Sequence, residues 1–210
     1  VRYWVTINEP MVYVRMHYLQ GIGPPGARDL AQALRVMEHL IRAHAAAYRV
    51  LHEASRGPGP APQVSIAHHA PAFWPCRRWW PPDRWVTAQT DRAFNWALLE
   101  ALTEGRWVVP GAGTRRIPEA AATLDYFGVN FYGRQFIRWV PAPGSWPGSS
   151  CDLGHHPREV TERTSFGWDV HPDSFFEVLS RIGRMGRPIL VTENGTYMTD
   201  DARRWDFISR

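Results

Sequence analysis

Four short apolar segments alternate along the chain with longer segments of helical periodicity. The apolar segments are residues 5–7, 63–67, 125–132 and 188–192. The segments predicted to be helical are residues 29–55, 83–104 and 173–181, and a further helix begins at Asp201. Because strands that alternate with helices form βαβ units, this order predicts an α/β protein with a parallel sheet.

Four strand–helix units are half the number in a (β/α)₈ barrel, which usually has about 250 residues. A four-stranded parallel sheet cannot close on itself and leaves two edges without a partner strand. No internal repeat and no linker divides the sequence. We therefore expect residues 1–210 to form a single partial TIM barrel, with self-association through its exposed edges. The chain begins beside a strand and ends inside a helical pattern, so we expect it to be part of a longer protein.

Two glutamates each follow a predicted strand. Glu9 follows the first strand in Asn8-Glu9-Pro10, and Glu193 follows the fourth in Thr192-Glu193-Asn194. Pro10 is expected to end the strand and to hold Glu9 in an extended conformation. Barrel enzymes carry catalytic groups at the carboxyl ends of the strands. Glycoside cleavage requires one carboxylic acid at the leaving oxygen and one carboxylate at the anomeric carbon. The pair therefore predicts a catalytic domain that hydrolyses glycosides.

Longer motifs around these glutamates resemble those of family 1 glycoside hydrolases. Residues 3–10, YWVTINEP, resemble the family's acid/base motif, and residues 191–195, VTENG, resemble its nucleophile motif. Residues 125–132 are similar to the family's sixth strand, and residues 167–170 to the segment before its next helix. The resemblance covers essentially the whole chain in the family's order. It implies roughly strands four to seven of the barrel with their helices.

The resemblance implies a retaining β-glycosidase of the β-glucosidase type, which acts on a small-molecule β-glycoside by double displacement. Glu9 would be the general acid/base and Glu193 the nucleophile. Asn8 would hydrogen-bond the sugar 2-hydroxyl, and Asn130 would lie on the same rim. Tyr132 would donate its hydroxyl to Glu193 and keep this carboxylate oriented and ionised.

Some aromatic and imidazole side chains have competing interpretations. Trp168 would line the aglycone side of the site, or pack as a wedge between a loop and the barrel. One ring of His68-His69 should face the barrel mouth and the other the outer layer. A metal site at His155-His156 is not favoured, because no carboxylate stands at a suitable spacing. Two carboxylates suffice for the chemistry, so we expect no cofactor and no metal.

The charge pattern and the length of the apolar runs argue against a nucleic-acid-binding protein and against a membrane-spanning one. The net charge of +4 comes from Arg alone, and its arginine pairs are scattered among acids rather than gathered on one face, which argues against a nucleic-acid partner. No apolar run reaches the ~20 residues of a membrane span. The two cysteines, Cys76 and Cys151, are expected to be free thiols in a reducing, cytoplasmic location.

Two other functions stay open at this point. The chain could be a non-catalytic half-barrel remnant that binds sugar weakly or folds with a partner chain. It could also belong to another barrel glycosidase family, which would predict no match at residues 130–132. Segments with which family members hold the glycone are absent, so its identity stays open, including whether it is a 6-phospho sugar. The Pro-, Gly- and Ser-rich residues 140–165 are expected to form a long surface loop.

Overall fold

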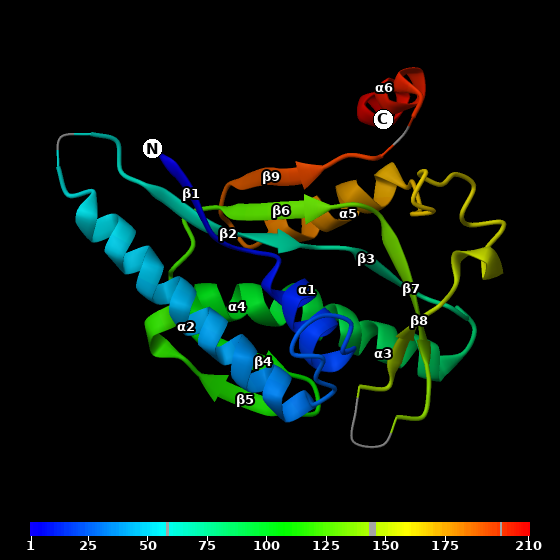
Figure 1. Cartoon of the computed structure of the whole chain (residues 1–210), viewed down its shortest axis with the longest axis horizontal. Helices are drawn as coiled ribbons and strands as arrows, with labels where there is room; N and C mark the ends of the chain where they lie inside the picture. Colours follow the sequence, from blue (N-terminus) through cyan, green and yellow to red (C-terminus); the bar gives the residue numbers. More distant parts are fainter. Residues whose placement is uncertain (58, 143–145, 198) are drawn as a thin grey trace.

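A four-stranded parallel sheet in the order β1-β2-β6-β9 forms the centre of the computed structural model (Figure 1). Its strands are β1 (Tyr3–Asn8), β2 (Gln63–His69), β6 (Phe127–Phe131) and β9 (Ile189–Asn194). The structure describes residues 1–57, 59–142, 146–197 and 199–210. The predicted strands and their parallel pairing are confirmed. The sheet does not close on itself, so the fold is a partial (β/α)₈ barrel.

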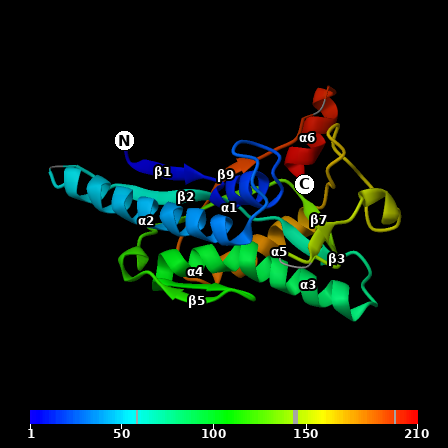
Figure 2. The ribbon, with the colours of Figure 1, turned by 60° about the horizontal axis from the view of Figure 1, so that its bottom comes forward.

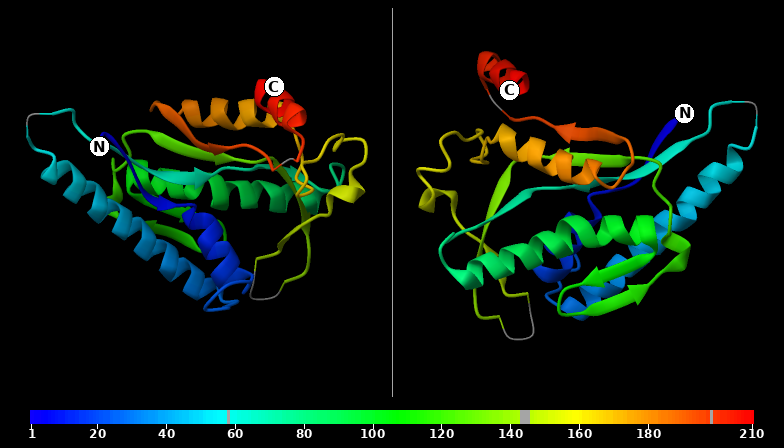
Figure 3. Two further views of the ribbon diagram at one scale, coloured as in Figure 1. Left: turned by 45° about the horizontal axis from the view of Figure 1, so that its top comes forward. Right: turned by 180° about the vertical axis from the view of Figure 1, so that it is seen from behind.

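Helices from the three crossover connections share one apolar core with the sheet. They are α2 (Leu30–Ala54), the π-helical turn η2 (Arg92–Trp96), α4 (Ala97–Glu104) and α5 (Pro172–Gly183), whereas α3 (Pro81–Asp91) packs against the second sheet described below. The core includes Met37 and Leu98 of the helices and Phe127 of β6. The view from behind shows α5 passing in front of β6 and β9, with α3 and α4 below it (Figure 3). The side chain of Asp29 caps α2 by accepting from Gln32 N at 3.0 Å, as its pattern predicts.

The outer edges of β1 and β9 have no partner strand among the described residues. Tyr3 and Val5 of β1 are 53% and 43% exposed, and Leu190 and Val191 of β9 are 42% and 41% exposed. In a closed barrel, neighbouring strands and helices would cover these residues. The last helix, α6 (Asp201–Ser209), buries no residue and stands apart from the sheet (Figures 1 and 2).

Asp125, two residues before β6, holds the amino ends of β2 and β6 against α2. Its Oδ2 accepts from Val64 N and His52 Nε2, both at 2.8 Å, and its Oδ1 accepts from the Tyr48 hydroxyl at 2.8 Å. One carboxylate thus joins α2, β2 and the start of β6. His44 is also buried in this layer and bonds Thr6 Oγ1 and the Thr123 carbonyl, so this histidine has a structural role.

A second sheet continues beyond the carboxyl ends of β2 and β6, and the sequence did not predict it. It consists of β3 (Ala72–Pro75), β7 (Arg134–Trp139) and β8 (Gly148–Ser150). Two further strands, β4 (Arg106–Val109) and β5 (Gly113–Arg116), form a hairpin. The expected loop at 140–165 therefore contains β8 and a 3₁₀ turn, Leu153–His155; its residues 143–145 lie outside the described residues.

Cys76 and Cys151 form a disulfide, so the expectation of free thiols is wrong for this structure. The two residues are 75 positions apart in sequence. Both flank β7: Cys76 N donates to Ile137 O at 2.8 Å, and Cys151 N donates to Phe136 O at 2.7 Å. Pairing with adjacent residues of one strand brings their Cα atoms to 6.0 Å, which the sequence pattern cannot reveal. In the described part of the chain, no helix is long and apolar enough to cross a membrane.

Candidate active site

Glu9 occupies the junction between β1 and helix α1 (Pro10–Val14). Its backbone has φ 44° and ψ 54°, so the expectation of an extended conformation is wrong. The amide of Glu9 donates to Ala67 O of β2 at 2.8 Å, and its carbonyl accepts from Tyr13 N at 3.0 Å. The backbone of Glu9 thus makes one hydrogen bond to the sheet and one in the first turn of α1. A left-handed conformation of a residue other than glycine is strained and is stabilised here by both bonds.

Asn130, at the end of β6, connects the two glutamate-bearing strands. Its Nδ2 donates to Glu9 Oε1 at 2.9 Å and to Asn8 Oδ1 at 3.2 Å. Its Oδ1 accepts from the hydroxyl of Thr192, the neighbour of Glu193, at 2.6 Å. The side chain is completely buried, so its orientation is fixed by these partners.

Glu193 lies opposite Asn130 in the register of β6 and β9. Its Oε2 accepts a hydrogen bond of 2.8 Å from the hydroxyl of Tyr132. Burial, together with this hydrogen bond, raises the pKa of Tyr132 to about 12. The hydroxyl therefore keeps its proton at neutral pH and remains a donor to the carboxylate.

The surroundings of Glu9 favour its protonated form. Burial raises the pKa of Glu9, the hydrogen bond from Asn130 opposes this, and the charge of Glu193 raises the pKa further. His69 Nδ1 lies 3.7 Å from Glu9 Oε1. Burial and the charge of Arg15 lower the pKa of His69 to about 4, so the contact is not an ion pair at neutral pH. As expected, one ring of the pair faces the site: His69 lines its cavity, whereas His68 is fully buried and does not.

A cavity of about 540 Å³ adjoins these groups. Glu9, His69, Tyr132 and Trp168 contribute to its wall. Trp168 is 47% exposed and meets Tyr132 edge-on, with ring centroids 5.3 Å apart. Glu193 does not line this cavity directly but is bonded to Tyr132, which does. The structure thus gathers Asn8, Glu9, Asn130, Tyr132, Trp168 and Glu193 at one end of the sheet.

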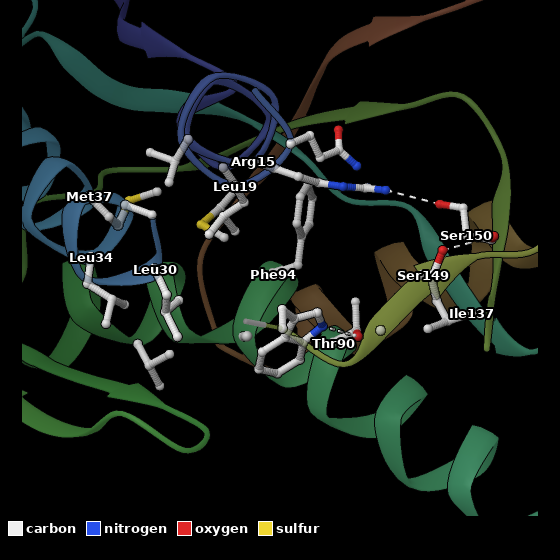
Figure 4. A pocket seen from close by; sticks show the side chains of 18 of the residues that line it. Arg15, Leu19, Leu30, Leu34, Met37, Thr90, Phe94, Ile137, Ser149 and Ser150 are labelled. Carbon is white, nitrogen blue, oxygen red and sulfur yellow. Dashed lines mark hydrogen bonds between the residues drawn. The ribbon is translucent and has the colours of Figure 1, made fainter. Parts of the chain in front are cut away.

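Arg15 separates this cavity from a second, mainly apolar one of about 410 Å³ (Figure 4). Arg15 lies on the π-helical turn η1 (Arg15–Leu19) and donates to Gln135 Oε1 at 3.0 Å and to Ser150 Oγ at 3.1 Å. Leu19, Leu34, Met37 and Phe94 line the apolar cavity beneath it. Sequence reasoning did not identify Arg15, because its place depends on β7 and β8.

A buried ion pair closes another side of the first cavity. Arg134 Nε and Nη2 donate to both carboxylate oxygens of Asp169, and Arg134 Nη2 also donates to Glu159 O at 2.6 Å. Both side chains are almost fully buried. Next to Arg134, Gly133 has φ 145°, and a side chain there would meet the Asp169 carbonyl at 2.5 Å. These contacts hold residues 167–170, with Trp168, against β7.

The chain is similar to known proteins in sequence and in fold. The family model described as Glycosyl hydrolase family 1 matches residues 1–208. A β-glucosidase A of Thermotoga maritima is 25% identical over 95% of this chain, and a β-galactosidase of Sulfolobus acidocaldarius is 26% identical over 95%. The solved structure of a β-glycosidase from Pyrococcus horikoshii superposes with a TM-score of 0.85 at 33% identity over 99% of this chain.

The chain spans under half of these relatives: 45% of the Thermotoga protein, 39% of the Sulfolobus protein and 46% of the Pyrococcus structure. A family 1 β-glucosidase from Thermotoga maritima shares the fold, with a TM-score of 0.80 at 23% identity.

Proposed function

The chain belongs to glycosyl hydrolase family 1, and from this premise we propose that it supplies the two catalytic carboxylates of a retaining β-glycosidase. Relatives named β-glucosidase and β-galactosidase support a β-glucoside or β-galactoside as substrate. The chain supplies half of a barrel, so the activity belongs to a completed barrel. By this we mean the chain joined to the strand–helix units that it does not contain.

The observation that carries the proposal is the contrast between the two glutamates. Glu9 is partly buried, with a raised pKa, and can hold a proton for the leaving oxygen. Glu193 accepts a hydrogen bond from the Tyr132 hydroxyl, which stabilises and orients a carboxylate. One acid and one carboxylate in different surroundings are what a double displacement requires.

The first displacement makes a covalent intermediate. Glu193 attacks the anomeric carbon, the bond to the leaving oxygen breaks, and Glu9 gives its proton to that oxygen. In the second displacement Glu9, now a carboxylate, takes a proton from water as this water attacks the anomeric carbon and releases Glu193. Two inversions give net retention. We expect the two carboxyl groups to lie about 5–5.5 Å apart.

Other side chains of the site would position the sugar. Asn8 Oδ1 accepts from Asn130, which leaves the Asn8 amide NH₂ free to donate to a sugar 2-hydroxyl. Such a bond strengthens as positive charge develops on the ring. The exposed face of Trp168 offers an aromatic surface on the aglycone side.

A mechanism-based label tests the proposal. A 2-deoxy-2-fluoro glycoside with an activated leaving group should form a glycosyl-enzyme on the completed barrel that hydrolyses slowly. Peptide mass mapping should place the added mass on Glu193, and Glu193→Gln should remain unlabelled. A label on any other residue, or full activity of Glu193→Gln, would refute the assigned roles.

A further inference from the structure

A cluster of sulfur and imidazole groups lies outside the candidate catalytic residues. Cys76 follows β3, Cys151 follows β8, and His155 and His156 belong to the turn between β8 and residue 160. The ligand atoms of Cys76, Cys151 and His156 all lie within 4.8 Å of one another. Cys151 also lines the candidate active-site cavity.

Backbone contacts hold the cluster independently of the disulfide. Cys76 and Cys151 are each hydrogen-bonded through their amides to β7. In the turn, Asp152 accepts from Gly154 N at 2.5 Å, and His156 N donates to Leu153 O at 3.0 Å. The ring of His156 stacks on Phe136 of β7 with centroids 3.8 Å apart. Cys76, Cys151 and His156 are therefore gathered by the fold itself, and His155 adjoins Cys151.

Two nitrogen–sulfur separations within the cluster match a tetrahedral metal site. With Zn–S bonds of about 2.3 Å and Zn–N bonds of about 2.05 Å, tetrahedral angles place nitrogen and sulfur ligands about 3.6 Å apart. Cys151 Sγ lies 3.4 Å from His156 Nε2 and 3.6 Å from His155 Nδ1.

Glu159 gives the cluster a second feature of metal sites. Its Oε2 lies 2.8 Å from His156 Nδ1, so this nitrogen donates to the carboxylate. In neutral imidazole the other nitrogen, Nε2, then carries a lone pair, and this lone pair points at the sulfur of Cys151. No proton lies between a disulfide sulfur and this nitrogen. A carboxylate that fixes a histidine tautomer in this way is typical of zinc ligation. The sequence-based view that no carboxylate stands at a suitable spacing is wrong, because Glu159 follows His156 by three positions.

We propose that Cys76, Cys151 and His156 form a tetrahedral zinc site when the two cysteines are in the thiol form, with the neighbouring His155 turning toward them as the fourth ligand. Two thiolates and two neutral imidazoles balance the charge of one Zn²⁺ ion. The disulfide and the zinc site are alternative states of the same sulfur atoms. The ion ties the turn at residues 153–156 to β3 and so fixes one wall of the candidate active-site cavity.

Conversion of the disulfide to the zinc site requires a two-electron reductant, such as a pair of thiols. The disulfide accepts two electrons and two protons, and two reductant thiols become one disulfide. Zn²⁺ then replaces the two protons of the cysteine thiols, which are released to solvent. In zinc-bound form the sulfurs lie about 3.8 Å apart, a separation that rotation of the cysteine side chains can supply.

Cobalt binding to the whole chain tests the proposal without an activity assay. After reduction with a phosphine and removal of metal, Co²⁺ should bind at one equivalent, with thiolate charge-transfer bands and the intense visible bands of tetrahedral Co²⁺. Added Zn²⁺ should bleach both. The oxidised chain should show neither. Absence of these bands in the reduced chain, or equal binding by the oxidised chain, would overturn the proposal.

Variants assign the ligands. Cys76→Ser should halve the charge-transfer intensity, and His156→Gln should abolish tetrahedral binding. His155→Gln should weaken binding with water as the fourth ligand, and Glu159→Gln should weaken it about 10- to 100-fold. His39→Gln, on the exposed face of α2, is the control and should bind as the parent does. Circular dichroism verifies that each variant is folded. Retention of parental cobalt spectra in Cys76→Ser or His156→Gln would refute the site.

Discussion

The side-chain amide of Asn130 donates to the carboxylate of Glu9 at 2.9 Å, although the two residues are 121 positions apart and their strands are separated by β2. Through its carbonyl oxygen the same side chain accepts from Thr192, beside Glu193. The two glutamates proposed as catalytic are therefore positioned through one buried amide.

Replacing Asn130 should change the pH dependence of the completed barrel. The Asn130 hydrogen bond stabilises ionised Glu9 and lowers its pKa, so Asn130→Ala should raise this pKa. Glu9 then stays protonated to higher pH, and the alkaline limb of the kcat/KM profile moves upward. At the optimum, kcat/KM should fall roughly tenfold or more because Glu9 and Asn8 are less well oriented.

Thr192→Val provides the matched control for this prediction. It removes only the donor to the Asn130 carbonyl oxygen, so Asn130 can still bond Glu9 and the alkaline limb should move less. An alkaline limb that does not move in Asn130→Ala would show that this amide does not control the proton on Glu9.

Asp125→Ala should destabilise the chain. The substitution leaves Val64 N, the Tyr48 hydroxyl and His52 without their acceptor, so we expect a loss of about 2–4 kcal/mol in the free energy of unfolding. Asp173→Ala, at an exposed position in the first turn of α5, should cost under about 1 kcal/mol. Urea unfolding at low protein concentration measures both. Equal losses would contradict the role of Asp125 as the clamp between α2 and the sheet.

The isolated chain should self-associate through β1 and β9. Their outer edges have no partner strand among the described residues, and they expose Val5 and Leu190. Val5→Lys and Leu190→Lys should reduce association in sedimentation velocity, whereas Val50→Lys, on the exposed side of α2, should not. A monodisperse monomer with one cooperative thermal transition would contradict this prediction.

The parts of the fold that the sequence predicts are those with local determinants. Asp29 marks the start of α2, and the β-branched run before Asn8 marks a strand, because capping and periodicity act over a few residues. The motifs around Glu9 and Glu193 are equally local, and they predict the candidate site.

Several features that depend on contacts between distant segments were not predicted. Only two residues separate β3 from β2 and β7 from β6. Because no helical segment lies between them, the sequence pattern does not indicate a second sheet. Arg15 enters the site only because β7 and β8 supply Gln135 and Ser150 as its acceptors. The left-handed backbone of Glu9 likewise depends on its bond to Ala67 on the neighbouring strand.

The anomeric configuration of rescued products tests the assignment of the two glutamates most directly. In the completed barrel, Glu193→Gly should lose activity on aryl glycosides, and azide should restore it by entering the vacated side of the anomeric carbon. That single displacement gives a glycosyl azide of inverted configuration. Glu9→Ala still forms the glycosyl-enzyme from substrates with activated leaving groups, so its azide product passes through two displacements and retains configuration. Nuclear magnetic resonance of the two products distinguishes these results: opposite configurations are predicted, and the same configuration from both variants would contradict Glu9 as the acid and Glu193 as the nucleophile.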